Sequence, residues 1–274
     1  MTPPSRIVLL AGSSVCNTYL PEEQRHHRVL QKALEAHYGE GTAEVRNWAD
    51  NGEYIARFLL RGTYERLRKE TPGADLFILR YALNDAKRMG PEEFGRHNER
   101  LIDLLGEDFP GARFIMETGL YLDYPAHYRN DRNQQINPYW EEARAVARRR
   151  GFPLNDLYKA SEAATRQGRW DLRIRNQRVK PVVVDASRDA EFGPDPDWFT
   201  DVHPNPDGVR LAVETQVALL TELFPKALPS GGQKADRPER PVEEYCALLD
   251  YSLERLEQPP IHNPDQYQAP AEGH

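Results

Sequence analysis

Near its amino terminus the chain reads Arg6-Ile7-Val8-Leu9-Leu10-Ala11-Gly12-Ser13-Ser14-Val15-Cys16. This stretch begins as a short apolar run that includes β-branched residues, a pattern typical of a strand buried on both faces of a sheet. Gly12 allows the tight turn that such a strand needs before a helix begins. Ser13 and Ser14 follow the carboxyl end of the strand, where open α/β sheets bind ligands, so Ser14 is a candidate nucleophile. A single turn is a weak signal, and the alternative is that one of the serines caps the next helix.

Strands and helices alternate along the chain that follows. Further buried strands are expected at residues 43–49, 75–81, 112–117 and 152–158. The spacing of apolar residues predicts helices at residues 22–38, 54–69, 91–105, 138–150, 161–170 and 209–224. The polar and aromatic stretch 120–137 lacks periodicity and predicts a long loop. The alternation predicts an α/β fold, a three-layer α/β/α sandwich with a central parallel sheet that is flavodoxin-like in its layering.

The composition changes near Pro225, which indicates a boundary in the chain. We expect one α/β domain at residues 1–225 and a linker rich in Pro and Gly at 226–241. Residues 242–274 are expected to form a C-terminal helix, at 242–256, followed by a Pro-rich disordered tail.

The composition is that of a globular protein with a heavily charged surface. Of the 274 residues, 39% are hydrophobic and 29% are charged, and the net charge of −7 gives no basic footprint for nucleic acid. The two cysteines, Cys16 and Cys246, exclude a disulfide framework, and Cys16 is expected to pack as a small buried residue. No stretch approaches the roughly 20 apolar residues of a membrane span, and no signal peptide is visible. We therefore expect a cytoplasmic protein with no membrane partner.

Polar residues follow the first three predicted strands where each strand ends. They are Ser14, Asn51-Gly52 and Asn84-Asp85, and a fourth group, Asp201-Val202-His203, precedes the last helix of the domain. In a parallel sheet these ends can meet at one edge. Acyl transfer needs a serine, a histidine to take its proton, a carboxylate to orient the histidine, and donors for the oxyanion. The sequence therefore predicts an acyl-transfer site at this edge.

Four blocks of the sequence resemble those of the SGNH hydrolases, also called the GDSL esterase/lipase family. The blocks are Leu10-Ala11-Gly12-Ser13-Ser14-Val15, Asn47-Trp48-Ala49-Asp50-Asn51-Gly52, Ala82-Leu83-Asn84-Asp85 and Asp201-Val202-His203-Pro204-Asn205. The resemblance covers roughly residues 6–224 and keeps the family's order. It implies that Ser14 is the nucleophile and His203 the catalytic histidine. It also implies an oxyanion hole formed by the N–H groups of Ser14 and Gly52 and the side-chain amide of Asn84.

Three positions depart from the family pattern. Ser13 stands where the family has an aspartate, and Ala82 stands where it has a glycine. The family places its catalytic aspartate three residues before the histidine, and that residue here is Thr200. We expect Asp201 to orient His203, with Asp197 as the alternative. Many members of the family work with a backbone carbonyl in place of the aspartate, so the departure is compatible with activity.

Each of these residues also has a simpler structural interpretation. The sequence His203-Pro204-Asn205-Pro206 is an ordinary turn composition, and Asn84-Asp85 could form an Asx turn that caps the next helix. Gly52 could serve only the geometry of its turn. The functional interpretation is favoured because all four simple interpretations would have to coincide at one edge of the sheet.

The remaining polar and aromatic residues support fewer hypotheses. His26, His27 and His37 have no carboxylate at ligand spacing, and there is no Gly-rich phosphate loop or dinucleotide motif, so no metal or cofactor is expected. Trp48, Tyr81 and Tyr124 lie near the edge or in the predicted loop. They are equally compatible with ordinary packing and with a platform that binds a sugar ring.

The sequence leads to three functional hypotheses. The first is a serine esterase that removes a small acyl group, such as acetyl, from a polar, carbohydrate-like substrate through an acyl-enzyme on Ser14, with His203 as general base. The polar predicted loop and the lack of a broad apolar lid argue against a long-chain lipid. The second is an O-acyltransferase that uses the same serine. The third is a catalytically weak family member that binds a carbohydrate or a protein.

Overall fold

The computed structural model describes residues 4–121, 132–169, 204 and 206–261. Its strands are β1 (Ser5–Ala11), β2 (Ala43–Asn47), β3 (Leu76–Arg80), β4 (Arg113–Glu117) and β5 (Leu154–Asn155). Its α-helices are α1 (Ser13–Cys16), α2 (His26–Tyr38), α3 (Ile55–Leu60), α4 (Thr63–Glu70), α5 (Pro91–Asp108), α6 (Arg132–Arg150), α7 (Leu157–Arg166), α9 (Pro206–Leu223), α10 (Val242–Leu249) and α11 (Leu253–Glu257). Two short 3₁₀ helices, η1 (Glu22–Gln24) and η2 (Asp85–Lys87), complete the described elements.

The strands form one parallel sheet in the order β2-β1-β3-β4-β5. This is the flavodoxin-like order of a doubly wound sheet, which confirms the predicted fold class. The apolar run at 7–11 is buried throughout, with no residue more than 1% exposed, because helices cover both faces of β1.

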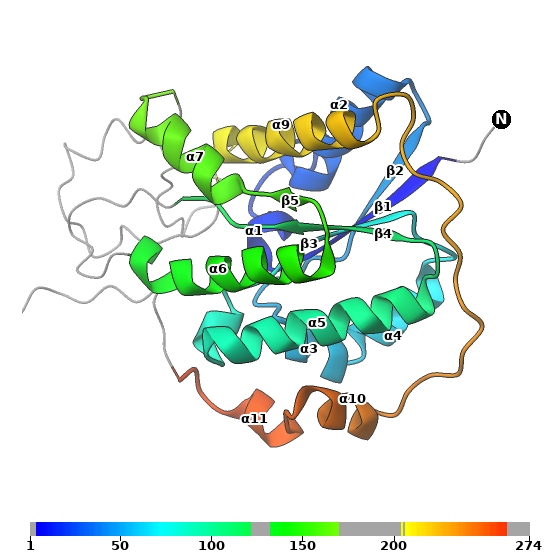
Figure 1. Cartoon of the computed structure of the whole chain (residues 1–274), viewed down its shortest axis with the longest axis vertical. Coiled ribbons are helices and arrows are strands. Elements are labelled where there is room, and N and C mark those ends of the chain that lie inside the picture. Colours follow the sequence, from blue (N-terminus) through cyan, green and yellow to red (C-terminus); the bar gives the residue numbers. More distant parts are fainter. Residues whose placement is uncertain (1–3, 122–131, 170–203, 205, 262–274) are drawn as a thin grey trace, which may run out of the picture.

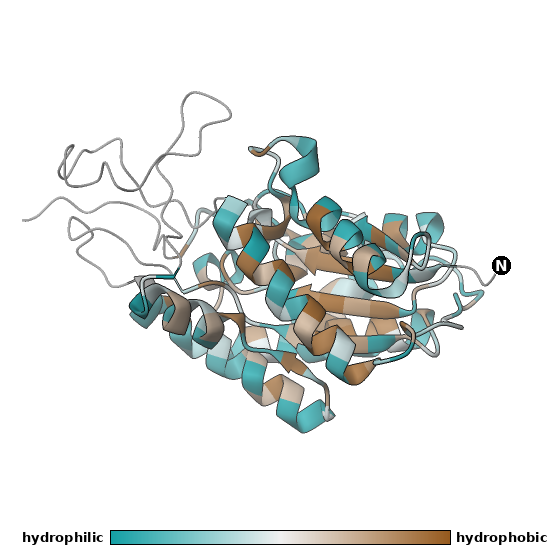
Figure 2. Ribbon diagram, turned by 90° about the horizontal axis from the view of Figure 1, so that it is seen from above, coloured by the Kyte–Doolittle hydropathy of each residue, from teal (hydrophilic) through white to brown (hydrophobic). Residues whose placement is uncertain are grey.

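Alternate side chains of β1 enter two separate cores. Val8 and Leu10 pack with α3, α4, α5, α6 and α10 on one face, whereas Ile7 and Leu9 pack with α2 and α9 on the other. Figure 1 shows the two helical layers on either side of the sheet, with α10 and α11 outside α3 and α5. Figure 2 shows largely hydrophobic strands, and helices that carry both hydrophobic and hydrophilic residues. Because successive side chains of a strand point to opposite faces, β1 contributes to both cores and anchors the helices on both faces of the sheet.

Several predicted boundaries differ from the observed ones. The helix predicted at 54–69 is two helices, because Gly62 adopts a left-handed φ of +77° between α3 and α4. The helix predicted at 161–170 begins at Leu157, since the Asp156 carboxylate caps α7 by accepting from Lys159 N at 3.4 Å. The same cap shortens the last strand to two residues, where residues 152–158 were predicted.

The predicted loop 120–137 is partly helical. Helix α6 begins at Arg132 and includes Pro138, which was expected at its start. A proline inside a helix removes one backbone donor. Ile136 and Trp140 on the same helix are at most 1% exposed, and their burial in the core stabilises the helix despite that loss.

The segment after α9 is held by hydrogen bonds from its backbone N–H groups to Asp75, just before β3, and to Asp108 at the end of α5. Gly232 N donates to Asp75 Oδ1 at 2.8 Å, and Ala235 N donates to Asp108 O at 2.8 Å. Figure 1 shows this segment passing the amino ends of the strands on its way to α10. The helix predicted at 242–256 is divided into α10 and α11 at Asp250, whose φ is +52°. The division into domain, linker and tail stays a prediction.

Candidate active site

Three of the predicted turns leave the sheet at the carboxyl ends of adjacent strands. β1 lies between β2 and β3, and Ala11 at the end of β1 pairs with Arg80 at the end of β3. The strand order reverses between β1 and β3, and open α/β sheets bind ligands at such a reversal. Gly52 follows β2, Ser14 follows β1 and Asn84 follows β3. The fold therefore places the three turns side by side.

Ser14 lies in the first turn of α1, three residues after the end of β1, and is 7% exposed. The N–H groups of Val15 and Cys16 both donate to Gly12 O, at 3.1 and 3.3 Å. The Ser14 N–H has no acceptor in the part of the chain that the structure describes, as expected for the first turn of a helix. It is therefore available to an oxyanion. Neither serine caps α1, because its N-cap residue is Gly12.

Gly12 is required by a close approach and not by its backbone angles. Its φ of −88° and ψ of −162° are extended and open to any residue, so the predicted need for a special turn conformation is wrong. A Cβ on Gly12 would lie 2.9 Å from Asn84 Nδ2 and 3.1 Å from Glu53 O. The missing side chain thus lets the turns after β2 and β3 approach the serine turn.

Asn84 precedes η2 without capping it. Its side chain makes no cap hydrogen bond, so the capping interpretation is wrong. Instead, Asn84 Nδ2 donates to Glu53 O at 3.0 Å. An amide nitrogen carries two hydrogens, and among the described residues this bond engages one of them. The neighbouring Asp85 fixes this turn, since its two carboxylate oxygens accept from Ile55 N at 3.0 Å and from Ala82 N at 3.1 Å.

Gly52 lies in an exposed turn that needs glycine. Its φ is +69°, which side-chain-bearing residues rarely adopt. Glu53 N donates to Asp50 O at 3.2 Å within this turn, and Asn51 Nδ2 donates to Thr18 Oγ1 at 3.1 Å. The second bond joins the Gly52 turn to the loop that follows α1, and so to the serine turn.

Two buried carboxyl groups lie beneath these turns. Burial raises the pKa of Glu53 to about 7, and the nearby Asp50 raises it further while Arg57 lowers it. Burial also raises the pKa of Asp85 to about 7, although three backbone N–H bonds act in the opposite direction. The charge of Glu53 also raises the pKa of Asp85, so the turns at Gly52 and Asn84 lie above two carboxyls that resist ionisation.

Two of the aromatic residues predicted to bind substrate, Tyr81 and Trp48, lie in or beside the core. Tyr81 is 3% exposed, and its ring lies 6.3 Å from that of Phe58. Trp48 is half-buried, with the Arg66 guanidinium 5.3 Å above its ring. Tyr81 therefore offers little ring surface to a ligand. Substrate binding by Trp48 and Tyr81 stays a prediction.

The predicted base and its orienting carboxylates lie outside the described residues. These are His203, Asp201 and Asp197, together with the aromatic Tyr124. The structure does describe Pro204, whose carbonyl accepts a hydrogen bond from Tyr19 Oη at 2.5 Å. Tyr19 follows Ser14 by five residues. The residue next to His203 in the chain therefore contacts the loop that continues from the serine turn.

A buried polar network, which the sequence analysis missed, lies at the same edge of the sheet. Arg80 at the end of β3 forms an ion pair and a hydrogen bond with Glu117 at the end of β4. Gln216 on α9 and Asn155 on β5 both donate to Glu117 Oε2 at 2.8 Å. His26 Nε2 lies 2.8 Å from Gln216 Oε1, and burial together with Arg80 lowers the His26 pKa to about 3. The one sequence signal for this network is Arg80, a charged residue near the end of the mostly apolar segment 75–81.

Other kinds of site find no support in the described part of the chain. Burial raises the pKa of the Cys16 thiol, so this residue is a packed thiol and not a thiolate nucleophile. Among residues 4–121, 132–169 and 206–261, no three His, Cys, Asp or Glu side chains could together hold a metal ion. None of the helices described is long and apolar enough to cross a bilayer.

Comparison with known families gives one match that covers most of the chain. A profile described as the GDSL-like lipase/acylhydrolase family matches residues 10–211. The match begins in β1 and ends in α9, so it includes all four sequence blocks. No curated protein sequence matches the chain.

Several solved structures share the fold at low sequence identity. LAE5, an α/β hydrolase from the metagenome of Lake Arreo in Spain, is 16% identical, with a TM-score of 0.57 over 80% of this chain and 96% of its own. The acetyl xylan esterase AlAXEase is 19% identical, with a TM-score of 0.56 over 77% and 98%. Axe2, an acetylxylan esterase from Geobacillus stearothermophilus, is 15% identical, with a TM-score of 0.53 over 80% and 96%. At these identities the likeness concerns the fold.

Proposed function

This chain belongs to the GDSL-like lipase/acylhydrolase family, and from that premise we propose that it is a serine esterase with Ser14 as nucleophile. Ser14 Oγ attacks the ester carbonyl and passes its proton to His203, which then protonates the leaving alcohol. Water attacks the acyl-enzyme with His203 again as the base, and Ser14 Oγ recovers a proton. Asp201, or Asp197 in its place, orients the histidine.

The observation that supports this proposal most strongly is the approach of Asn84 to the serine turn. Asn84 Nδ2 lies 2.9 Å from the point that a Cβ of Gly12 would occupy, two residues before Ser14. The other two proposed donors are the Ser14 N–H, which has no acceptor among the described residues, and the N–H of Gly52 in the turn that Asn51 joins to the loop after α1. Such a set stabilises the oxyanion of a tetrahedral intermediate.

The substrate we propose is a small acyl ester of a polar, carbohydrate-like alcohol. Two proteins of similar fold, AlAXEase and Axe2, are acetyl xylan esterases, and this supports an acetylated polysaccharide as the first class to test. Trp48 and Tyr124 are the candidate contacts to the sugar.

Hydrolysis of p-nitrophenyl acetate by Ser14→Ala tests the nucleophile. The variant should lose at least about 10³-fold in kcat, because the acyl-enzyme cannot form. Ser13→Ala is the matched control, since it removes the neighbouring hydroxyl from the same turn, and it should remain active. A Ser14→Ala rate equal to that of the wild type would exclude the esterase mechanism and favour a binding role. Acetylated and butyrylated xylo-oligosaccharides would then test the acyl and sugar preferences.

Asn84→Ala tests the oxyanion hole independently of the nucleophile. Loss of one such donor lowers kcat by about 10²–10³-fold. The KM for p-nitrophenyl acetate should change little, because the donor acts mainly on the charge that develops in the transition state. A variant with wild-type kcat would remove Asn84 from the proposed site.

A further inference from the structure

The loop after α1 is organised by one buried amide. Asn17 is fully buried and has a left-handed φ of +51°. Its Nδ2 donates to Ser14 O at 3.1 Å and to Tyr19 Oη at 3.0 Å, and its Oδ1 accepts from His26 N at 3.2 Å. Both amide hydrogens and the amide oxygen are thus engaged. The side chain fixes the serine turn relative to Tyr19 and to the start of α2.

Tyr19 extends this connection to the far end of the matched region. Because its oxygen accepts from Asn17, its single hydrogen is left to donate, and it does so to Pro204 O at 2.5 Å. Burial raises the pKa of the Tyr19 hydroxyl above its ordinary value, which keeps that hydrogen in place. Pro204 has no N–H, so its carbonyl is its sole backbone hydrogen-bonding group.

A second contact anchors the same region to the sheet. His26, directly bonded through its N–H to Asn17, contacts Gln216 on α9 at 2.8 Å, and Gln216 donates to Glu117 at 2.8 Å. Helices α2 and α9 also pack side by side on this face of the sheet (Figure 1). The bond to Pro204 is therefore held between rigid elements.

We propose that Asn17 and Tyr19 are positioning residues that hold Pro204, the residue after His203 in the chain, at a fixed place relative to Ser14. This inference rests on the proposed esterase function. Pro204 follows His203 directly in the chain. The hydrogen bond from Tyr19 therefore acts one residue away from the proposed base. Proton transfer needs the two heavy atoms within about 2.6–3.2 Å, and a shift of about 1 Å can lower the rate about 10²-fold.

Tyr19→Phe removes the hydroxyl and leaves the ring, and Tyr38→Phe is its matched control. Tyr38 Oη on α2 lies 3.1 Å from two carbonyl oxygens, that of Leu220 in α9 and that of Phe224 just after it, and these share its single hydrogen. These carbonyls lie at the carboxyl end of α9, whereas Pro204 precedes its amino end. Both variants lose one tyrosine hydroxyl that contacts a carbonyl near an end of α9. Only the contact of Tyr19, before the amino end of α9, is next to His203 in the chain.

The two variants are compared with the wild type and with Ser14→Ala in hydrolysis of p-nitrophenyl acetate. Tyr19→Phe should lower kcat about 10- to 100-fold with KM within about twofold, and should slow the labelling of Ser14 by a fluorophosphonate to a similar degree. Tyr38→Phe should keep the wild-type kcat, and the two variants should show similar shifts in the urea unfolding midpoint.

Equal kcat values for Tyr19→Phe and Tyr38→Phe, whether both high or both low, would overturn the positioning role while an inactive Ser14→Ala upheld the esterase. A Ser14→Ala variant as active as the wild type would overturn the proposed function, and the positioning role with it. A Tyr19→Phe variant whose loss lies entirely in KM would also contradict the inference, because positioning of the base acts on kcat.

Discussion

At the scale of single residues, Ala82 carries backbone strain in the candidate site. Its φ is +144°, a conformation that glycine adopts and L side chains rarely do. The residue is held there from both sides, because Ala82 N donates to Asp85 Oδ2 at 3.1 Å and Ala86 N donates to Ala82 O at 2.8 Å. The sequence block that contains Ala82 resembles one with glycine at this position, and the structure supplies the physical reason.

Ala82→Gly should therefore stabilise the protein. Strain of this kind costs about 1–3 kcal/mol, and glycine relieves it. The greater freedom of glycine in the unfolded chain lowers stability by about 0.4–1 kcal/mol, so a net stabilisation of about 1 kcal/mol is expected. Urea unfolding measures it. Ala86→Gly, in η2 and 3% exposed, is the control, since its φ is not positive and the change should destabilise. Loss of stability in both variants would mean that Ala82 is not strained.

At the candidate site, the sequence predicted where the turns lie better than it predicted the contacts that shape them. Glycine at position 12 was expected for a local turn, but it is required by Asn84, which is 72 positions away in the chain. Asn17 and Tyr19 were missed altogether, because their roles depend on His26 and Pro204 and leave no mark on the local sequence. Short-range patterns identify turns, whereas close approaches between distant parts of the chain are decided by the packed structure.

At the scale of elements, the Glu53 carboxyl in the turn between β2 and α3 should make the free energy of unfolding depend on pH. Glu53 is 2% exposed, and burial raises its pKa from 4.5 to about 7. The folded state thus binds this proton more tightly than the unfolded state. Its contribution to stability is complete below about pH 4 and is lost as the pH rises through about 7. Asp85, with its pKa also raised to about 7, acts in the same direction.

Glu53→Gln should remove this loss, because glutamine stays neutral. The free energy of unfolding of the variant minus that of the wild type should grow from about zero near pH 4 to on the order of 3 kcal/mol near pH 8. Taking this difference cancels other groups such as His26, whose lowered pKa acts in the opposite direction. Urea unfolding between pH 4 and 8 measures the difference. Glu92→Gln, whose side chain is 91% exposed, should give a curve parallel to that of the wild type. A constant difference for Glu53→Gln would show that its carboxyl is ionised in the fold at neutral pH.

Elements were predicted well where their pattern is local. The run 7–11 is a strand with apolar side chains on both faces, which favours burial on both sides. This pattern can be recognised from these residues alone. Helix α6 was partly missed because it crosses Pro138 and is stabilised by the burial of Ile136 and Trp140. The start of a helix such as α6 is decided by packing against other elements, and the local sequence pattern does not record that packing.

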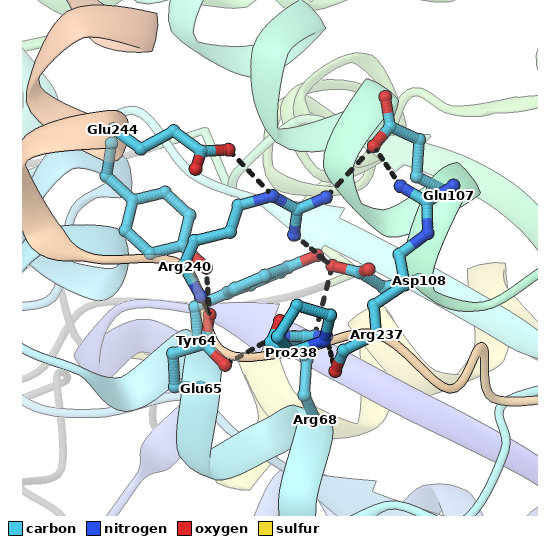
Figure 3. Close-up of polar contacts among 10 residues, drawn as sticks. Tyr64, Glu65, Arg68, Glu107, Asp108, Arg237, Pro238, Arg240 and Glu244 are labelled. Atoms are coloured by element: carbon cyan, nitrogen blue, oxygen red, sulfur yellow. Dashed lines mark hydrogen bonds and ion pairs between the residues drawn. The ribbon is translucent and has the colours of Figure 1, made fainter.

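At the scale of the whole molecule, the C-terminal segment is fixed to the α4–α5 face by buried charges (Figure 3). Asp108 ends α5, where a negative charge opposes the helix dipole and requires compensation. Arg240 Nη1 donates to Asp108 Oδ2 at 2.6 Å, Tyr64 Oη donates to the same oxygen at 2.7 Å, and Arg68 Nε lies 3.1 Å from it. Arg68 Nη2 also donates to Arg237 O at 3.0 Å. Composition alone indicated a linker here, because these partners lie more than 100 positions away.

This geometry distinguishes the buried anchor from the exposed contacts of the same segment. Asp108 is fully buried, whereas Lys69 and Glu239 pair at 2.7 Å with side chains 60% and 58% exposed. Asp108→Ala should destabilise the protein by about 3 kcal/mol, because it removes the buried acceptor that Arg68, Arg240 and Tyr64 share. Arg68 then keeps Glu65 as its ionic partner, and Arg240 keeps only the more exposed Glu107 and Glu244. Glu239→Ala removes an ion pair from the same segment and should cost less than about 1 kcal/mol.

Urea unfolding and trypsin cleavage test this contrast together. Asp108→Ala should be cleaved faster after Arg237 and Arg240, because loss of the anchor frees the segment that carries both, whereas Glu239→Ala should resist trypsin as the wild type does. Equal stability and equal cleavage rates in the two variants would contradict the assignment. The segment would then be held by the apolar contacts of α10, whose Tyr245 and Leu249 are at most 4% exposed in the α3–α5 core, and its buried charges would only compensate one another.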